Sequence, residues 1–237
     1  MFGFLKKKGN GRVARKDQLQ VTAESGNAIA QCDLALRYEE TGDLDEAFFW
    51  FEKSAKSGDA QAQVNFALCF FLGNGTRKNI EKAKYWNLEA ANNPSADKKN
   101  KNNSRCNLGQ IYLIAQKEPE KALEWFKAAA EDGCSESQAY LGEMYDHGKG
   151  VVKDLEEAAH WYLLAAEKDV ERAQFNIAEM YLFGEGVEIN HLEALRWMTK
   201  SAEKGNKMAI DRVTAMAKDI EAQGLIKKQK KIEPGNI

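Results

Sequence analysis

The sequence has little of what several classes of protein require. It contains only three prolines and four cysteines in 237 residues, and no two cysteines form a Cys-x-x-Cys pair. Few prolines permit long helices, and the scattered cysteines indicate neither a disulfide framework nor a zinc site. No segment approaches the roughly 20 consecutive apolar residues of a membrane-spanning helix. The composition, 43% hydrophobic and 30% charged, is typical of a folded, mostly helical protein.

Acidic residues are absent from residues 1–16, which carry six basic side chains, and four more lysines lie between positions 227 and 231. The net charge is −2, so setting these ten cations aside leaves about −12 on the rest of the chain. A nucleic-acid-binding protein usually presents a basic face, and this body is acidic. The amino terminus places a short apolar run before its lysines, the reverse of a secretory signal. We therefore expect a cytoplasmic protein with reduced cysteines and no nucleic acid partner.

What the sequence does contain is an internal repeat, marked by its tryptophans. They lie 36, 39, 36 and 36 residues apart, at Trp50, Trp86, Trp125, Trp161 and Trp197. Alanine recurs three residues before each tryptophan and five residues after it. An apolar anchor followed four residues later by an aromatic precedes each of them: Leu34/Tyr38, Phe66/Phe70, Leu108/Tyr112, Leu141/Tyr145 and Ile177/Tyr181. A fixed period of this length is typical of stacked helical repeats.

Each repeat is predicted to contain two helices. The anchor segment shows apolar residues at i, i+3, i+4 and i+7, and the segment with Ala-x-x-Trp forms the second helix. Between them, three repeats carry Gly-x-Gly, which is expected to end the first helix because glycine adopts the left-handed conformation at low cost. Asn79, Asp154 and Asn190 then occupy the position of a helix N-cap.

Repeats one and three lack the Gly-x-Gly and are shorter, which predicts tighter turns between their helices. The polar stretch at 92–103, with Pro94, is predicted to be an exposed loop. We expect one repeat domain at 15–224, with repeats at about 27–58, 60–92, 104–133, 136–169 and 172–205. A lone second helix at 15–25 and a helix at 206–222 are expected to cap its ends. Residues 1–14 and 225–237 are predicted to be basic, flexible tails.

The strongest repeats, "QAYLGEMYDHGKGVVKDLEEAAHWYLLAA" and "AQFNIAEMYLFGEGVEINHLEALRWMTKSA", resemble the Sel-1-like repeat family. Repeat five departs from the family pattern at Ala178 and Met198, and repeat two at Phe70 and Thr76. The resemblance, over about residues 27–205, implies an all-α, right-handed superhelical α-solenoid of about five helix-turn-helix repeats. It also implies a scaffold or adaptor for other proteins, commonly in bacteria, and no reaction.

No residue cluster predicts catalysis or a cofactor. His147, His160 and His191 lack the i, i+4 spacing of helical metal ligands. The cysteines occupy core positions, one of them replacing a methionine, and no histidine accompanies them at a catalytic spacing. The Gly-x-Gly turns lack the strand and lysine of a phosphate-binding loop. We therefore predict no enzyme, no catalytic or metal-binding residue, no cofactor and no small-molecule substrate.

One polar column is a candidate binding surface. The residue before each anchor is Asp33, Asn65, Asn107, Tyr140 or Asn176, among neighbours predicted to be buried. In tetratricopeptide solenoids, which the family resembles, this part of the first helix faces the concave groove. Asparagine offers a donor and an acceptor to a peptide backbone. The same face continues with Leu36, Leu68, Gln110, Glu143 and Glu179, then with Glu39, Phe71, Leu113, Asp146 and Leu182. The alternative is that the column is merely the solvated side of the first helices.

These patterns favour a non-enzymatic scaffold that binds a partner protein or an extended peptide in that groove. An apolar and acidic groove would suit hydrophobic and basic partner side chains. An immunity role against a toxin and a signalling role both fit. The alternative function is a peripheral membrane adaptor that uses Phe2, Phe4 and Leu5 beside the six cations of residues 1–16. Such a segment would attach weakly to anionic lipid.

Overall fold

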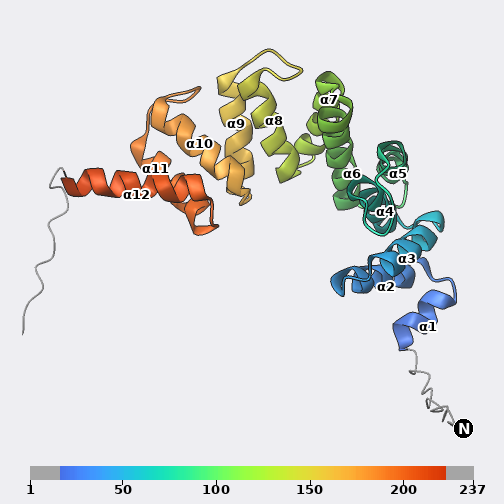
Figure 1. Ribbon diagram of the computed structural model, residues 1–237. Helices are drawn as coiled ribbons and strands as arrows, with labels where there is room; N and C mark the ends of the chain where they lie inside the picture. Colours follow the sequence, from blue (N-terminus) through green and yellow to red (C-terminus); the bar gives the residue numbers. More distant parts are fainter. Residues whose placement is uncertain (1–16, 223–237) are drawn as a thin grey trace, which may run out of the picture. The chain divides into compact units, whose positions relative to one another are not determined.

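The computed structural model describes residues 17–222 (Figure 1). The predicted tails at 1–14 and 225–237, and the membrane-binding segment at 1–16, lie outside this range. Within this range helices are joined by turns and short loops, and there is no β-strand. The helices are α1 Gln18–Glu24, α2 Ala28–Glu40, α3 Leu44–Lys56, α4 Ala60–Leu72, α5 Ile80–Asn92, α6 Lys98–Gln110, the π-helix η1 Ile111–Gln116, α7 Pro119–Glu131, α8 Ser135–His147, α9 Leu155–Glu167, α10 Glu171–Phe183, α11 His191–Glu203 and α12 Lys207–Ala222. The predicted all-α repeat fold is confirmed.

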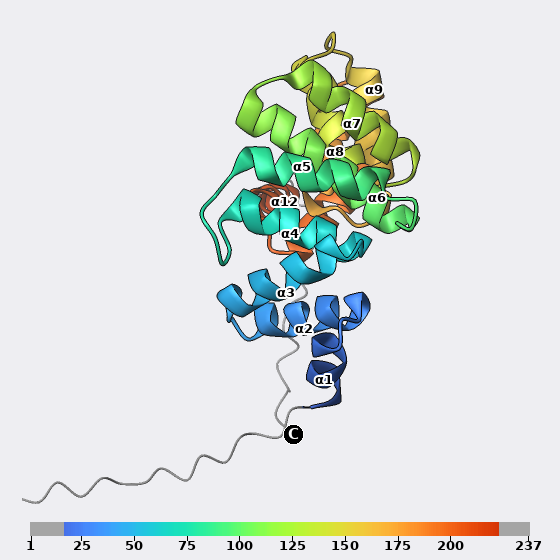
Figure 2. The ribbon, with the colours of Figure 1, turned by 90° about the vertical axis from the view of Figure 1, so that its right-hand side faces the viewer.

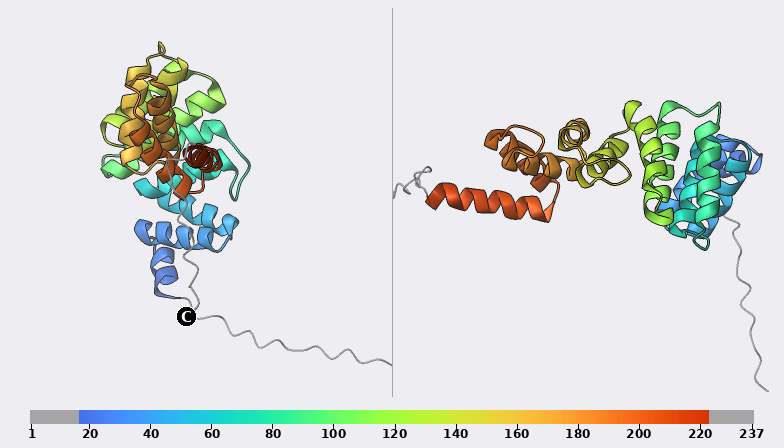
Figure 3. Two further views of the ribbon diagram at one scale, coloured as in Figure 1. Left: turned by 90° about the vertical axis from the view of Figure 1, so that its left-hand side faces the viewer. Right: turned by 90° about the horizontal axis from the view of Figure 1, so that it is seen from above.

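The chain divides into two compact units, the first ending at Ala96 and the second beginning at Asp97. In unit 1, α1 packs on α2, and the chain continues with α2 on α3, α3 on α4 and α4 on α5 (Figure 2). In unit 2, α6 packs on α7, and the series runs through α8, α9, α10 and α11 to α12 (Figure 3). Within each unit every α-helix therefore packs on the next, and α1 and α12 occupy the capping positions that the sequence predicts.

The core of each repeat is centred on the residue that follows the tryptophan. Phe51, Phe126 and Tyr162 are completely inaccessible to solvent, and Asn87 and Met198 are 1% exposed. The tryptophans vary more: Trp50 and Trp197 are buried, whereas Trp86, Trp125 and Trp161 are half-buried. The tryptophans thus mark the period of the repeat, while their neighbours fill its centre.

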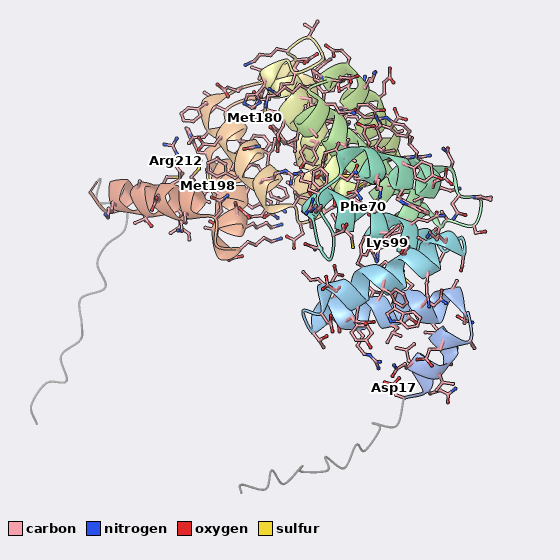
Figure 4. The ribbon with its side chains drawn as sticks, turned by 45° about the vertical axis from the view of Figure 1, so that its right-hand side comes forward. Asp17, Phe70, Lys99, Met180, Met198 and Arg212 are labelled. Atoms are coloured by element: carbon pink, nitrogen blue, oxygen red, sulfur yellow. The ribbon has the colours of Figure 1, made fainter. Side chains whose placement is uncertain are left out.

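Small residues on the first helices make room for these central side chains. A Cβ atom on Gly142 would lie 2.4 Å from Cδ1 of Tyr162, and one on Gly109 would lie 2.5 Å from Cε1 of Phe126. The rings therefore rest directly on the backbone of the first helix. Repeat five has Ala178 and the flexible Met198 in the same two positions, and both belong to one core cluster; Met198 is labelled in Figure 4.

The Gly-x-Gly turns have two functions, of which the sequence predicts only the first. Gly73, Gly148 and Gly184 end α4, α8 and α10 in the left-handed conformation. The predicted caps Asn79, Asp154 and Asn190 accept hydrogen bonds from the first turns of α5, α9 and α11. The second glycine of each turn, also at positive φ, lies against the first residue of the preceding second helix. These pairs are Gly75 with Leu44, Gly150 with Pro119 and Gly186 with Leu155.

Repeats one and three close with shorter turns, as predicted. In repeat one only Thr41, Gly42 and Asp43 separate α2 from α3. In repeat three the first helix continues as η1, and the left-handed Lys117 (φ 55°) and Glu118 connect it to α7.

The predicted loop at 92–103 is wrong over most of its length. α6 begins at Lys98, and Asp97 caps it by accepting a hydrogen bond from the Asn100 backbone N–H at 2.7 Å. Its polar side chains are used inside unit 2, since Ser104 is fully buried and Arg105 pairs with Asp132 at 2.6 Å. Local polarity therefore misleads where tertiary packing supplies the partners.

A row of buried glutamines joins successive repeats along one edge. Each donates from Nε2 to a carbonyl oxygen at the end of the preceding second helix: Gln31 to Ala23, Gln63 to Ala55, Gln138 to Ala130 and Gln174 to Ala166. Lys168 then donates to Oε1 of Gln138 at 3.2 Å and to the Gly133 carbonyl at 2.9 Å. Each of these alanine carbonyl oxygens also accepts a backbone N–H from the turn that follows its helix, so the glutamine adds a second hydrogen bond from the next repeat. These glutamines are not among the predicted functional residues, although each stands three residues before an anchor in the sequence.

Candidate partner-binding face

The polar column lies at the surface in both units, directly beside fully buried anchors. Asp33 is exposed, and Asn65, Asn107, Tyr140 and Asn176 are half-buried. The anchors that follow them are between 0% and 2% exposed. We define the first-helix face of a unit as the surface formed by this column and its two continuing rows. In unit 1 it belongs to α2 and α4, and in unit 2 to α6, η1, α8 and α10.

The first-helix face of unit 1 combines apolar and acidic side chains. Leu36, Leu68 and Phe71 are each half-buried, so part of their apolar surface meets solvent. Asp33 and Glu39 lie on the same face, and neither forms an ion pair within residues 17–222. The structure thus brings Asp33, Asn65, Leu68 and Phe71 onto one unit.

The first-helix face of unit 2 is occupied by the protein's own arginines. Arg172 of α10 contacts Glu136 at 2.8 Å and Glu143 at 3.0 Å, both on α8. Its guanidinium also lies 4.5 Å from the centre of the Tyr140 ring, whose plane stacks on Phe126 at 4.6 Å and 14°. Tyr140 is therefore held between a buried ring and a cation, an arrangement that favours a fixed side chain.

A second arginine repeats this pattern one repeat further along. Arg212 of α12, labelled in Figure 4, contacts Glu179 of α10 at 3.1 Å and lies 5.8 Å from the Phe183 ring. Two of the three predicted acidic residues of unit 2, Glu143 and Glu179, are thus paired with arginines of the protein itself, and the third, Asp146, lies 4.0 Å from Lys153. Arg212 lies beyond the predicted column, which ends at repeat five. Arg212 follows Asn176 by the repeat spacing of 36 residues.

A buried phenol lies beneath the unit 2 face. Tyr162 of α9 has its hydroxyl near Asn176, Glu143 and Asp146, and burial raises its pKa well above the ordinary value. Gly142 leaves the space through which the ring reaches this position. The Tyr162 hydroxyl has no hydrogen-bond partner among the described residues. Because its pKa is raised, it stays protonated near neutral pH, and the residue contributes by packing.

The remaining candidates for chemistry are dispersed. His147, His160 and His191 are all exposed on separate helices. Residues 17–222 contain no group of three or more side chains suited to holding a metal ion. None of the described helices combines the length and the apolar character needed to cross a membrane. A shallow hollow of about 430 Å³ lies in unit 1 beside Gly58, Gln63 and Asn93, and the glutamine row already uses its polar groups.

Comparison with known proteins agrees with this repeat architecture. A family model described as Sel1 repeat matches residues 28–59, 60–95, 103–134, 135–170 and 171–206. Among solved structures, a Sel1 repeat protein from Oxalobacter formigenes superposes with a TM-score of 0.71 at 26% identity, over 84% of this chain and 57% of that chain. The protective antigen c5321 of uropathogenic Escherichia coli gives 0.66 at 29% identity, over 92% of this chain and 52% of that chain.

A curated relative from Rattus norvegicus, "DAP3-binding cell death enhancer 1", is 32% identical over 161 residues. The matched part is 54% of this chain and 32% of that protein, so this chain spans only part of its relatives' length. Proteins built from this repeat generally act as scaffolds for protein interactions. Because the family model accounts for well over half of the residues in five consecutive matches, the chain belongs to the Sel1 repeat family.

Proposed function

We propose that this chain is a non-enzymatic protein-interaction module whose unit 1 first-helix face binds an extended segment of a partner protein. The observation that carries the proposal is the accessibility of Asp33, Leu68 and Phe71 beside fully buried anchors. Apolar side chains that stay at a surface are a common mark of an interaction site. The rat relative is also named for its binding to another protein, DAP3.

The chemistry of the two faces favours unit 1 as the stronger site. Leu36, Leu68 and Phe71 offer apolar contact, while Asp33 and Glu39 form no ion pair with another residue of 17–222 and would attract lysine or arginine. In unit 2, Glu143 and Glu179 are already paired with arginines. There Asn107, Gln110, Tyr140 and Asn176 would contribute polar contacts that orient the partner and add little charge attraction.

The test uses random linear peptides displayed on phage and selected on the immobilised full chain. We expect the enriched peptides to combine apolar residues with lysine or arginine. The double variant Asp33→Lys/Leu68→Asp should lower their affinity about tenfold or more, which corresponds to about 1.4 kcal/mol. Its matched control, Tyr85→Asp/Glu89→Lys, also replaces one apolar residue by Asp and one acidic residue by Lys, at exposed positions of α5. It should leave the affinity unchanged.

Two outcomes would overturn the proposal, provided that circular dichroism shows each variant to be folded. One is an equal loss of affinity in the control variant. The other is unchanged binding by the triple variant Asn65→Ala/Asn107→Ala/Asn176→Ala together with unchanged binding by Asp33→Lys/Leu68→Asp. Either result would mean that the column is only the solvated side of the first helices.

An immunity factor and a signalling adaptor would use the same face, and the identity of the partner distinguishes them. Attachment to a membrane surface, the alternative function, depends on residues 1–16 and stays a prediction. Sedimentation with anionic liposomes, with and without residues 1–16, tests it, and equal pelleting would refute it.

A further inference from the structure

Two of the four cysteines meet inside unit 2. Cys106 lies on α6 and is 5% exposed, in a core cluster with Phe126, Leu141 and Met144. Cys134, at the start of α8, packs against the same cluster and is partly accessible to solvent. The two thiol side chains share this cluster and lie close enough for each to shift the pKa of the other. This contact joins the first helix of repeat three to the first helix of repeat four.

Cys134 occupies the N-cap position of its helix. The first helices of repeats one and two have Asn27 and Asp59 at this position, and their side-chain oxygens accept backbone N–H groups. Cys134 makes no side-chain hydrogen bond that caps α8, but its sulfur lies beside the backbone N–H groups of Glu136 and Ser137 at the start of the helix. Donors at a helix N-terminus stabilise an anion, and a thiolate is the anion that cysteine can provide.

The electrostatics assign different roles to the two sulfur atoms. The nearby Cys106 thiol, followed by Ser137 and the helix backbone, lowers the pKa of Cys134 to about 6 despite partial burial. The same pairing, together with burial, raises the pKa of Cys106 far above its ordinary value. Cys134 is therefore the sulfur that ionises first. The accessible sulfur, of Cys134, is the nucleophile. The buried sulfur, of Cys106, is the second thiol of the pair.

We propose that Cys134 and Cys106 form a peroxide-reactive dithiol in which Cys134 is oxidised first and Cys106 then closes an intramolecular disulfide. The Cys134 thiolate attacks one oxygen of hydrogen peroxide, the O–O bond breaks, and with one proton from solvent the products are a sulfenic acid and water. Cys106 then attacks that sulfur, its thiol proton leaves with the hydroxide as a second water, and an S–S bond forms. The peroxide is reduced and the two thiols are oxidised.

The other two cysteines serve as internal controls. Cys32 and Cys69 are each 3% exposed, and burial raises the pKa of each to about 12. They lie in unit 1, with no second thiol among the groups that influence them. Structural cysteines of this kind react slowly because the thiolate is scarce and shielded.

The experiment treats the reduced, full-length chain with hydrogen peroxide and blocks the remaining thiols with N-ethylmaleimide for peptide mapping by mass spectrometry. We expect a Cys106–Cys134 disulfide, with Cys32 and Cys69 still reduced. Without peroxide, iodoacetamide should modify Cys134 at least about tenfold faster than Cys69 at neutral pH. In Cys106→Ser the sulfenic acid should persist and react with dimedone, whereas Cys134→Ser should leave Cys106 unoxidised.

The proposal fails if Cys32 and Cys69 are oxidised as fast as Cys134, or if the wild-type chain yields sulfenic acid but no Cys106–Cys134 disulfide. Both outcomes are read from the wild-type chain, so the test does not depend on the folding of a variant. It is also independent of any partner of the first-helix face.

Discussion

The carbonyl oxygen of Leu155 lies 2.1 Å from the position that a Cβ atom on Gly186 would occupy. Leu155 begins α9 of repeat four, whereas Gly186 lies in the turn of repeat five. The same relation holds for Gly75 with the Leu44 carbonyl oxygen at 2.2 Å, and for Gly150 with the Pro119 carbonyl carbon at 2.5 Å. The second glycine of each Gly-x-Gly is therefore a contact between neighbouring repeats.

Replacing this glycine should loosen the stack. Gly186→Ala places a Cβ into backbone at φ 68°, and we expect a loss of about 3 kcal/mol in the free energy of unfolding. The control Gly205→Ala has φ 94° with nothing within 4 Å, so only the backbone strain of about 1–2 kcal/mol should remain. Urea unfolding of the full chain measures both. Equal losses would contradict the contact.

The contact between Gly142 and Tyr162 predicts both the sign and the size of the change in unfolding free energy caused by Gly142→Ala. Alanine favours a helix over glycine by about 1 kcal/mol, so Gly142→Ala would stabilise α8 if space were available. We expect a loss of about 2 kcal/mol instead, because the Tyr162 ring fills that space. In a Tyr162→Met background, which imitates repeat five, the same change should cost less. A double-mutant cycle by urea unfolding tests this, and a stabilising Gly142→Ala would refute it.

The buried glutamines should contribute to the free energy of unfolding through their hydrogen bonds between repeats. Gln138→Leu keeps much of the side-chain volume but leaves the Ala130 carbonyl and the Lys168 ammonium without the partner that Gln138 provides. Because both groups keep a hydrogen bond to the Gly133 backbone, we expect a loss of about 1 kcal/mol in the free energy of unfolding. Gln61→Leu, at an exposed position of α4, should change it by less than about 0.5 kcal/mol. Similar effects of the two variants would argue against a structural role.

Arg172 should stabilise unit 2 through charge. Arg172→Gln removes contacts to Glu136 and Glu143, and since all three side chains are partly exposed we expect a loss of about 1 kcal/mol. High salt should shrink this loss by screening. Arg196→Gln, whose pair with Glu193 lies within one exposed turn, should have a smaller effect. Thermal unfolding at low and high salt measures both, and a salt-independent loss would point to packing.

The dithiol predicts a dependence of stability on pH. The pKa of Cys134 is about 6 in the folded chain against an ordinary value of 9.0, so the unfolded chain binds more protons between these limits. Stability from Cys134 is complete above about pH 9 and disappears as the pH falls through about 6. The raised pKa of Cys106 acts in the opposite direction only above about pH 9.

The comparison that checks this is wild type against Cys134→Ser, by urea unfolding under reducing conditions. The stability difference should grow in favour of the wild type as the pH rises from about 6 to about 9. A difference that stays constant over this range would show that Cys134 is not ionised in the folded chain.

Sequence reasoning reached the repeats and their caps because both are local properties. No knowledge of tertiary contacts is needed to find the spacing of Trp161 and Trp197 or the N-caps Asp154 and Asn190. It failed at 98–103 because that segment is helical only through its cap and its partners in unit 2. The polar column was also visible, and its role in binding stays a prediction.

The sequence alone determined the period, the two-helix repeat and the side of each first helix that meets solvent, since these follow from residues within one or two helical turns. The tertiary structure decided which residues face each other across repeats. Arg172 forms an ion pair with Glu143, and Gly186 packs against the backbone of Leu155. Cys106 lies close to Cys134. Such contacts depend on how one repeat stacks on the next, and that stacking is the sum of many packing interactions that no single segment encodes.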